Sequence, residues 1–163
     1  MADIADEAGI SRQSVYRFFD DRSALIRYIL DVRIAAAGKV IAKEFSAFET
    51  LEDALVDGSL LSIRIARQDD LFRTLVTDSA DHSLELFLLN VTPSIRKVMW
   101  SYWGPLIDKA RADGQIADHL TDDQIMEWLR HVHTTLTIRD EDDIEAQRSM
   151  LLNFFVPSII RQT

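Results

Sequence analysis

The chain has 163 residues, of which 47% are hydrophobic and 28% charged, a composition typical of a globular protein and not of a disordered one. Its net charge of -9 argues against a general nucleic-acid binder, and the absence of cysteine excludes disulfides, a thiol nucleophile and a cysteine-ligated zinc site. No stretch approaches the roughly 18 apolar residues that a membrane span needs. The first residues lack the basic start and apolar core of a signal peptide, so we expect a cytoplasmic location.

The negative charge is unevenly distributed along the chain. Residues 1–30 carry four arginines against five acidic residues, so the remaining residues hold -8 of the total charge. Between Ser11 and Leu30 the balance is +2, from four arginines against two aspartates. A nucleic-acid contact is therefore expected near the N-terminus and not in the body of the chain.

Glycine and capping residues predict two short helices at the start of the chain. Residues 2–8 form the first, and Gly9 ends it in the left-handed conformation that suits a helix C-terminus. Ser11 caps the second, which runs to about Phe19. The few residues between the two helices predict a tight turn.

A third helix is predicted to be long, from about Arg22 to Phe48, with Asp20 or Asp21 as its N-cap. It extends for roughly 40 Å at about 1.5 Å per residue, which is long enough to join two domains. One stripe of this helix is apolar and is expected to be buried. The stripe consists of Leu25, Ile29, Val32, Ala36 and Val40.

The rest of the chain predicts further helices with short breaks, and hence an all-α fold. Thr50 is the predicted N-cap of the next helix, with Asp53 in an imperfect capping box, and Thr121 is the N-cap of a later helix. Further helices are predicted at 69–77, at 84–91 after a loop at 78–83, and from Pro93 to Asp113-Gly114. The last helix is predicted to start with the acidic run Asp140 to Asp143. The expected apolar ridges are Leu51, Ala54, Leu55, Leu61 and Ile65; Ile95, Val98, Met99, Tyr102, Leu106 and Ala110; and Ile125, Leu129, Val132 and Leu136. Gly104-Pro105 predicts a kink or a break. Residues 150–160 are apolar nearly all round, so we expect burial, most naturally in a dimer interface.

The residues of the first turn carry the functional signal. A helix-turn-helix needs small residues where its helices cross, a tight turn, and an apolar residue inside that turn. Ala5 and Ala8 supply the small residues, Gly9 the turn and Ile10 the apolar residue. The spacing therefore predicts a helix-turn-helix.

The second helix of this motif is expected to bury one side and to present the other to DNA. Val15, Phe18 and Phe19 form the side to be buried. Arginine and glutamine can read base edges in the major groove, whereas serine, tyrosine and arginine can bind phosphates. The residues expected to contact DNA are Ser11, Arg12, Gln13, Ser14, Tyr16 and Arg17.

This run resembles the DNA-binding signature of TetR-family transcriptional regulators. The matching residues are Ile4-Ala5, Ala8-Gly9-Ile10-Ser11, Tyr16, Phe18-Phe19, Arg22 and Leu25. The resemblance implies that the helix from Ser11 to Phe19 is the recognition helix and that Tyr16 and Arg22 touch the DNA backbone. Arg22 stands where the family usually has lysine, a change that keeps a phosphate contact.

The resemblance extends more loosely downstream. The stretch 110–116 and two final helices with Pro157 resemble the family's ligand-binding domain, whose last two helices pair with their copies in a four-helix bundle. This implies a DNA-binding domain at 1–30, joined by the long helix to a ligand-binding and dimerisation domain at 31–163. The implied function is a ligand-responsive repressor that binds a palindromic operator as a homodimer.

Family members begin with a helix before the one that opens this chain, and it covers the apolar side of the motif. Here Met1 lies at the start of the second helix, which indicates a start placed too late or a truncation. We expect Ile4, Phe18 and Phe19 to lose their cover, and residues 1–20 to be poorly ordered and to bind DNA weakly. The alternative function is therefore a small-molecule-binding dimer that does not bind DNA.

Bulky aromatic residues beside Gly104-Pro105 are typical of a pocket between helices, although ordinary core is the competing interpretation for each of them. The expected contacts to a largely apolar effector are Phe72, Met99, Trp100, Trp103, Trp128 and His131.

His131 and His133 are two residues apart and so face different sides of a helix, and no histidine has the spacing of a helical metal site. Neither a nucleophile elbow nor a phosphate-binding glycine loop is present. We expect no metal, no cofactor and no enzyme activity.

Overall fold

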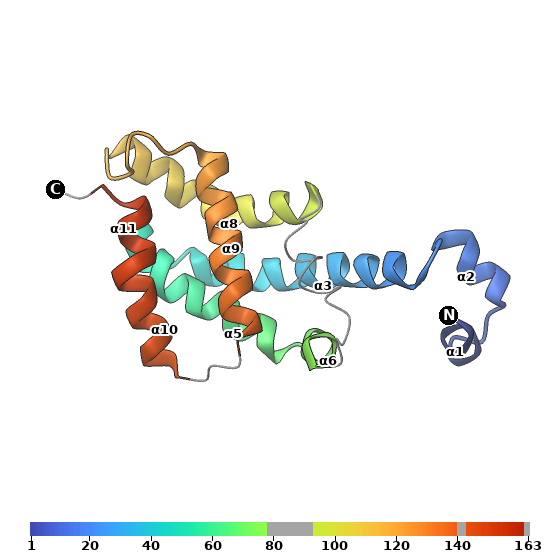
Figure 1. The fold of residues 1–163 in the computed structure, drawn as a ribbon. Coiled ribbons are helices and arrows are strands. Elements are labelled where there is room, and N and C mark those ends of the chain that lie inside the picture. Colours follow the sequence, from blue (N-terminus) through green and yellow to red (C-terminus); the bar gives the residue numbers. More distant parts are fainter. Residues whose placement is uncertain (78–92, 140–142, 162–163) are drawn as a thin grey trace. The chain divides into compact units, whose positions relative to one another are not determined.

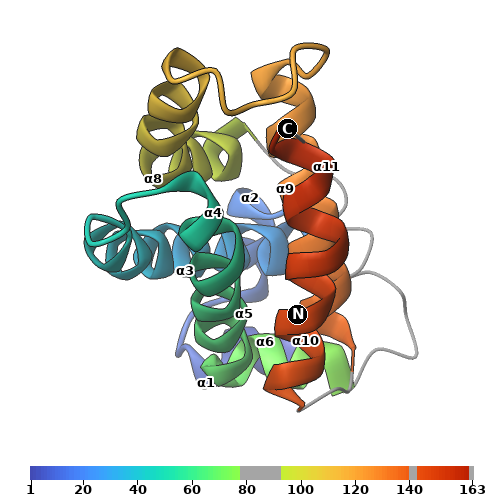
Figure 2. The same cartoon turned by 90° about the vertical axis from the view of Figure 1, so that its left-hand side faces the viewer.

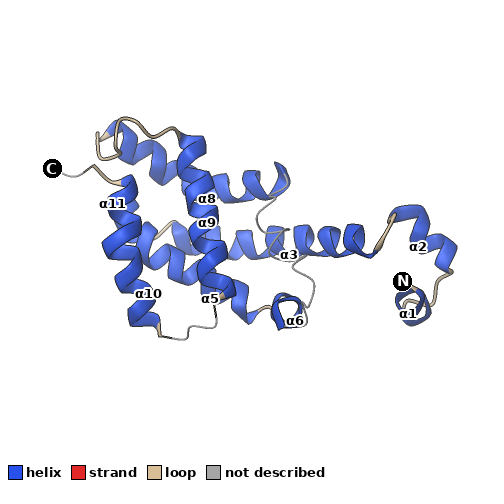
Figure 3. Ribbon diagram, viewed as in Figure 1, coloured by secondary structure: helices blue, strands red, loops and turns tan. Residues whose placement is uncertain are grey.

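The computed structural model describes residues 1–77, 93–139 and 143–161. Within these ranges every regular element is helical and no strand occurs, which confirms the all-α fold class (Figure 3). The chain divides into two compact units, residues 1–33 and residues 34–163, which we call unit 1 and unit 2. No helix of the described residues is long and apolar enough to cross a membrane.

Unit 1 consists of α1 (Ala2–Glu7), α2 (Arg12–Phe18) and the first part of α3 (Arg22–Phe45). Gly9 has a φ of 64°, which confirms the left-handed residue predicted after the first helix. The N-cap of α3 is Asp21, whose carboxylate accepts a hydrogen bond of 2.6 Å from the backbone of Ala24. Both short helices are formed. Poor order of residues 1–20 stays a prediction, which amide hydrogen exchange would test.

Helix α3 ends at Phe45 and not at Phe48, and its predicted stripe is partly wrong. Val32, Ala36 and Val40 are exposed, whereas Leu30, Ile41 and Phe45 are buried. The helix carries apolar residues on several sides, so its own pattern does not single out one face. Packing against the rest of unit 2 decides which side of α3 is buried. Gly38 is buried against Val98, because a residue without a Cβ lets α3 and the helix that carries Val98 approach closely.

Unit 2 continues with α4 (Leu51–Asp53), the π-helical turn η1 (Ala54–Gly58), α5 (Ser59–Gln68) and α6 (Asp70–Thr77). Thr50 caps α4 as predicted, since its hydroxyl accepts a hydrogen bond of 3.1 Å from the backbone of Asp53. In the predicted ridge, residues 51, 54 and 55 are buried and residues 61 and 65 are partly buried against the core. The loop predicted at 78–83 and the helix predicted at 84–91 lie outside the described residues.

Helix α8 (Pro93–Ala112) runs through Gly104-Pro105 without interruption, so of the two expected outcomes the break is wrong. Proline removes one backbone donor, but burial holds the helix together on both sides of it. Tyr102, Trp103, Leu106 and Ile107 are all buried. Gly114, with a φ of 67°, ends the segment as predicted.

The last two helical segments lie side by side and run in opposite directions (Figures 1 and 2). The first is α9 (Asp122–Ile138), which begins with a complete capping box between Thr121 and Gln124. The second combines α10 (Ile144–Met150), the π-helical turn η2 (Leu151–Phe155) and α11 (Val156–Ile159), with Asp143 as its N-cap. Within the single chain, residues 150–160 are buried on one face only, and their burial in a dimer interface stays a prediction. Residues 151, 155, 156 and 159 are buried, and residues 150, 152 and 154 are exposed.

One apolar core fills unit 2. It takes buried side chains from α3, from the segment 51–63 and from α8, α9 and α10–α11. Among the described residues, the largest fully buried side chain is that of Trp103. Arg67 closes one end of the core, because its guanidinium donates to the carbonyl groups of Leu136 at 2.8 Å and Arg139 at 2.5 Å at the C-terminus of α9.

Candidate nucleic-acid interface and ligand site

The turn between α1 and α2 has the geometry that the sequence predicts. The backbone N–H of Ile10 donates to the carbonyl of Ala5 at 3.0 Å, and Ala5 is fully buried. The hydroxyl of Ser11 accepts a hydrogen bond of 3.1 Å from the backbone of Ser14 and so caps α2. The small residue Ala5, the left-handed Gly9 and the N-cap Ser11 together set the orientation of α2 relative to α1.

Helix α2 presents a polar surface. The exposed residues are Ser11, Arg12, Gln13, Tyr16 and Arg17, and Ser14 is partly exposed. Val15 is buried on the opposite side. Arg22, at the start of α3, is also exposed.

Of the three residues on the apolar side of α2, only Val15 is buried, and the exposure of Phe18 agrees with its expected loss of cover. Phe18 is 70% exposed and not buried, and the guanidinium of Arg17 lies 5.0 Å from its ring centre. Phe19 is partly buried and packs on Tyr28, with ring centres 5.4 Å apart. Tyr28 is a contact that the motif alone did not reveal, because it lies on the next helix.

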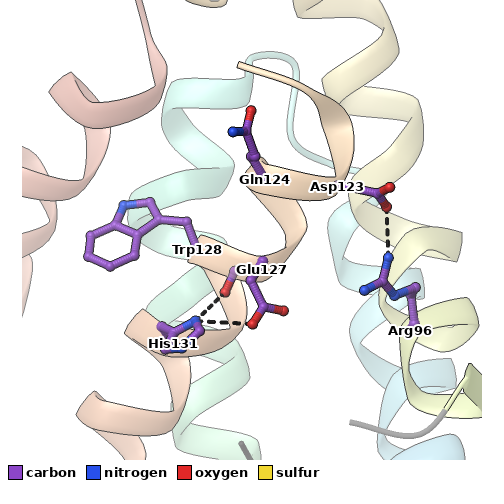
Figure 4. Close-up of a pocket in the computed structure, with 6 residues that line it drawn as sticks. All are labelled: Arg96, Asp123, Gln124, Glu127, Trp128 and His131. Carbon is purple, nitrogen blue, oxygen red and sulfur yellow. Dashed lines mark hydrogen bonds and ion pairs between the residues drawn. The ribbon is translucent and has the colours of Figure 1, made fainter. Parts of the chain in front are cut away.

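The six predicted effector contacts occupy different places in unit 2. Trp103 lies in the core. Met99 is partly buried and lines a cavity of about 20 Å³, and Trp100 covers Gly104. Trp128 and His131 lie together on the exposed side of α9 (Figure 4). Nothing is described of the side chain of Phe72.

Trp128 and His131 line a surface groove of about 510 Å³ together with Arg96, Asp123, Gln124 and Glu127 (Figure 4). Arg96 pairs with Asp123 at 2.7 Å. A ring nitrogen of His131 lies 2.8 Å from the carbonyl oxygen of Glu127. The hydrogen bond from Arg130 lowers the pKa of the Glu127 carboxyl. Charged pairs therefore form much of this groove.

A second polar pair lies partly buried in unit 2, and the sequence pointed to His133 but not to its partner Ser59. His133 shares a hydrogen bond of 2.8 Å with Ser59, and its ring centre is 5.8 Å from that of Trp103. Burial lowers the pKa of His133 to about 4, so its imidazole is neutral at pH 7. As expected, His131 and His133 point to different surroundings. The partner Ser59 is 74 residues away in the chain, so only the fold reveals the pair.

The indole N–H of Trp103 is buried and has no hydrogen-bond partner in the described part of the chain. Burial also raises the pKa of the neighbouring Tyr102 hydroxyl, which therefore stays protonated. Among the described residues, no group of three or more histidine, aspartate or glutamate side chains could hold a metal ion.

Comparison with known proteins adds one finding. Residues 1–29 match the family model described as bacterial regulatory proteins, tetR family. No curated protein matches the chain. The matched residues cover α1, α2 and the first turns of α3.

Proposed function

We propose that the chain is a DNA-binding transcriptional regulator of the TetR family, whose model residues 1–29 match, and that it is a ligand-responsive repressor that binds a palindromic operator as a homodimer. The observation that supports the proposal best is α2, a capped helix with an exposed polar face and a buried anchor at Val15. Such a helix fits the major groove with its polar face towards the bases.

The exposed residues of α2 are suited to different contacts with DNA. Arg12 and Gln13 are its first two residues, and the N-terminal residues of a recognition helix meet base edges. Arginine pairs best with guanine and glutamine with adenine. We assign sequence discrimination to these two side chains.

The other polar residues are better suited to phosphates. The hydroxyl groups of Ser11 and Ser14 are 2.8 Å apart and bond to each other, which leaves them little capacity for base edges. The Arg17 guanidinium lies over the Phe18 ring. We assign phosphate contacts to these residues and to Tyr16 and Arg22.

The homodimer is proposed to form through the exposed side of the last two helical segments. The indole N–H of Trp128 donates to Ser158 at 2.8 Å, and Arg139 contacts the sulfur of Met150 at 3.5 Å, so the two segments are aligned along their length. Trp128 is 46% and Phe154 70% exposed. We call Trp128, Met150 and Phe154 the α9–α11 face. A second copy of this face would cover its apolar surface.

Ligand response requires that effector and operator prefer different states of the dimer. Helix α3 contributes residues to both units, which makes it the proposed link between them. An effector bound in unit 2 would favour a spacing of recognition helices that no longer fits successive major grooves. By linkage, bound effector would lower the affinity for operator by the same factor by which bound operator lowers the affinity for effector.

Fluorescence anisotropy against the intergenic DNA upstream of the chain's own gene, at two salt concentrations, tests the DNA-binding part. We expect binding that weakens steeply with salt. Arg12→Ala and Gln13→Ala should weaken operator binding about tenfold or more and relax base preference at one position each. Lys97→Ala removes a charge from an exposed residue of α8 and should leave binding unchanged.

Two outcomes would contradict this assignment. Uniform weakening across all DNA sequences would make Arg12 a phosphate contact and not a base reader. Absence of binding to every DNA tested would favour the alternative, a small-molecule-binding dimer without DNA binding. The oligomeric state is measured separately by sedimentation, where Phe154→Glu should shift the dimer towards monomer.

A further inference from the structure

The chain contains two Asp-Gly dipeptides, Asp57-Gly58 and Asp113-Gly114, which lie in different surroundings. In such a dipeptide the backbone nitrogen of glycine can approach the side-chain carboxyl group of the aspartate, because glycine has no Cβ to obstruct it. A bond between these two groups closes a five-membered ring. Ring closure requires that the backbone can rotate and that the carboxyl group can reach the nitrogen, so the surroundings of each dipeptide decide its rate.

The first dipeptide, Asp57-Gly58, is fixed by packing and by an ion pair. Gly58 is buried at the end of the π-helical turn η1, and α5 continues directly from it. A Cβ on Gly58 would lie 2.7 Å from the ring of Phe45, so the backbone has no room to rotate. The carboxylate of Asp57 forms an ion pair with the guanidinium of Arg148. Ring closure here requires that this part of the helix unfold first.

The second dipeptide, Asp113-Gly114, lies in open surroundings after the end of α8. Both residues are exposed, and a Cβ on Gly114 would meet no atom within 4 Å. The nitrogen of Gly114 donates a hydrogen bond of 3.0 Å to the carbonyl of Arg111. In the part of the chain that the structure describes, the carboxylate of Asp113 has no hydrogen-bond or ion-pair partner. Ring closure here requires only that an exposed turn opens.

We propose that Asp113-Gly114 is a site of spontaneous isoaspartate formation and that Asp57-Gly58 is protected from this reaction by the fold. The Gly114 nitrogen attacks Cγ of Asp113 and loses its proton, and the hydroxyl group of the carboxyl leaves as water. One water molecule then opens the cyclic imide at either carbonyl. Opening at Cγ restores aspartate, whereas opening at the backbone carbonyl leaves the main chain running through Cβ and Cγ. Water is lost and regained, so the reaction needs no oxidant and no cofactor.

The product would weaken the attachment of the end of α11. Isoaspartate adds one carbon atom to the backbone immediately before Gly114. The next residue, Gln115, donates a hydrogen bond of 2.9 Å to the carbonyl of Ala110 and accepts one of 2.7 Å from the backbone of Arg161. Gln115 therefore joins the end of α8 to the segment that follows α11. Because the extra atom displaces Gln115, both hydrogen bonds should weaken.

Incubation of the full chain at 37 °C and mildly acidic pH tests the proposed site. Trypsin cleaves the chain into peptides that hold the two dipeptides separately, residues 44–64 and residues 112–130. Electron-transfer fragmentation then distinguishes isoaspartate from aspartate at each residue. We expect isoaspartate to form about tenfold faster, or more, at Asp113 than at Asp57, because Asp57 can react only after local unfolding. In the chain unfolded by urea the two rates should become similar, since the fold no longer separates them.

Asp113→Glu provides the matched variant. It keeps the negative charge but places the carboxyl group one carbon further from the backbone, which disfavours ring closure. Amide hydrogen exchange of the incubated chains then measures the structural consequence. We expect faster exchange at Gln115 and Arg161 in the incubated wild-type chain than before incubation, and unchanged exchange at both residues in the incubated variant.

Two results would overturn the proposed site: equal rates at Asp57 and Asp113 in the folded chain, or no isoaspartate at Asp113. Unchanged exchange at Gln115 and Arg161 in a wild-type chain that carries isoaspartate would overturn the weakened attachment of α11. None of these measurements involves DNA or an effector, so they are independent of the proposed function.

Discussion

The two compact units use their apolar side chains in different ways. In unit 1 the buried apolar residues are Ala5, Val15 and Leu30, while Ile4, Ile10 and Phe18 are exposed. In unit 2 one continuous core includes Trp103, Leu129 and Ile159, each with no exposed surface. The stability of unit 1 therefore depends largely on its helix caps and turn geometry, whereas the stability of unit 2 depends on the burial of apolar side chains.

The two expected sites also differ. The DNA contacts of unit 1 are exposed on one short helix, next to the cap and the turn that orient it. The effector contacts expected in unit 2 are spread between its core, where Trp103 lies, and its surface, where Trp128 and His131 lie. Four changes, from the largest expected effect to the smallest, would break or sharpen this comparison.

Leu129→Ala should produce the largest loss of stability. Leu129 is fully buried, and removal of a core leucine side chain costs about 3 kcal/mol, within a range of roughly 2–5. Val15→Ala in unit 1 removes less surface from a smaller core and should cost about 1 kcal/mol. Urea unfolding followed by circular dichroism measures both. Equal losses would show that the two cores are equally well packed.

Acidification should destabilise unit 2 through His133. Its pKa is about 4 in the fold and about 6.5 when unfolded, so the unfolded chain binds the extra proton first. This contribution to stability is complete above about pH 6.5 and is lost as the pH falls towards 4, by at most about 3 kcal/mol.

Urea unfolding at a series of pH values measures this slope. His133→Gln should remove it, and His119→Gln, at an exposed residue, should retain it. A slope that survives in His133→Gln would assign the effect to the carboxylates, among which Glu127 loses its stabilising contribution only below its usual pKa.

Gly58→Ala should cost about 2 kcal/mol, because the new methyl group would lie 2.7 Å from the ring of Phe45, which is itself buried in the core. Gly9→Ala meets no atom within 4 Å and should cost only about 1 kcal/mol, from its left-handed backbone. Thermal unfolding compares the two variants. If Gly58→Ala leaves the unfolding temperature unchanged, the ring of Phe45 can move aside without loss of stability.

Ser11→Ala should have the smallest effect, about 1 kcal/mol, because one N-cap hydrogen bond is lost. Amide hydrogen exchange should become faster at Ser14 and Val15 and stay unchanged in α9. Thr121→Ala is the matched change in unit 2, where it removes a capping box. Faster exchange throughout the chain after Ser11→Ala would contradict the local role of this cap.

Local features were predictable from sequence to a large extent. Ser11, Thr50 and Thr121 cap the predicted helices, and Gly9 and Gly114 have positive φ. Each of these features depends on a few neighbouring residues. The whole helix-turn-helix lies within one continuous stretch, which is why its residues could be named individually.

Features set by packing were harder to predict. The buried side of α3 depends on Gly38 meeting Val98, 60 residues later in the chain. The continuation of α8 through Pro105 depends on the core on both sides of it. The pair of His133 and Ser59 joins two helices, and neither residue has a neighbour in sequence that marks it.

The end of the described chain returns to a much earlier segment. The N–H of Ala117 donates to the carbonyl of Ile159 at 3.0 Å, and the N–H of Arg161 donates to that of Gln115 at 2.7 Å, on either side of a bridge between Ile116 and Ile160. On the ribosome, unit 1 has all its residues once Arg33 has emerged. The core of unit 2 stays incomplete until Ile159 and Arg161 have emerged, so we expect unit 2 to fold only at the end of synthesis.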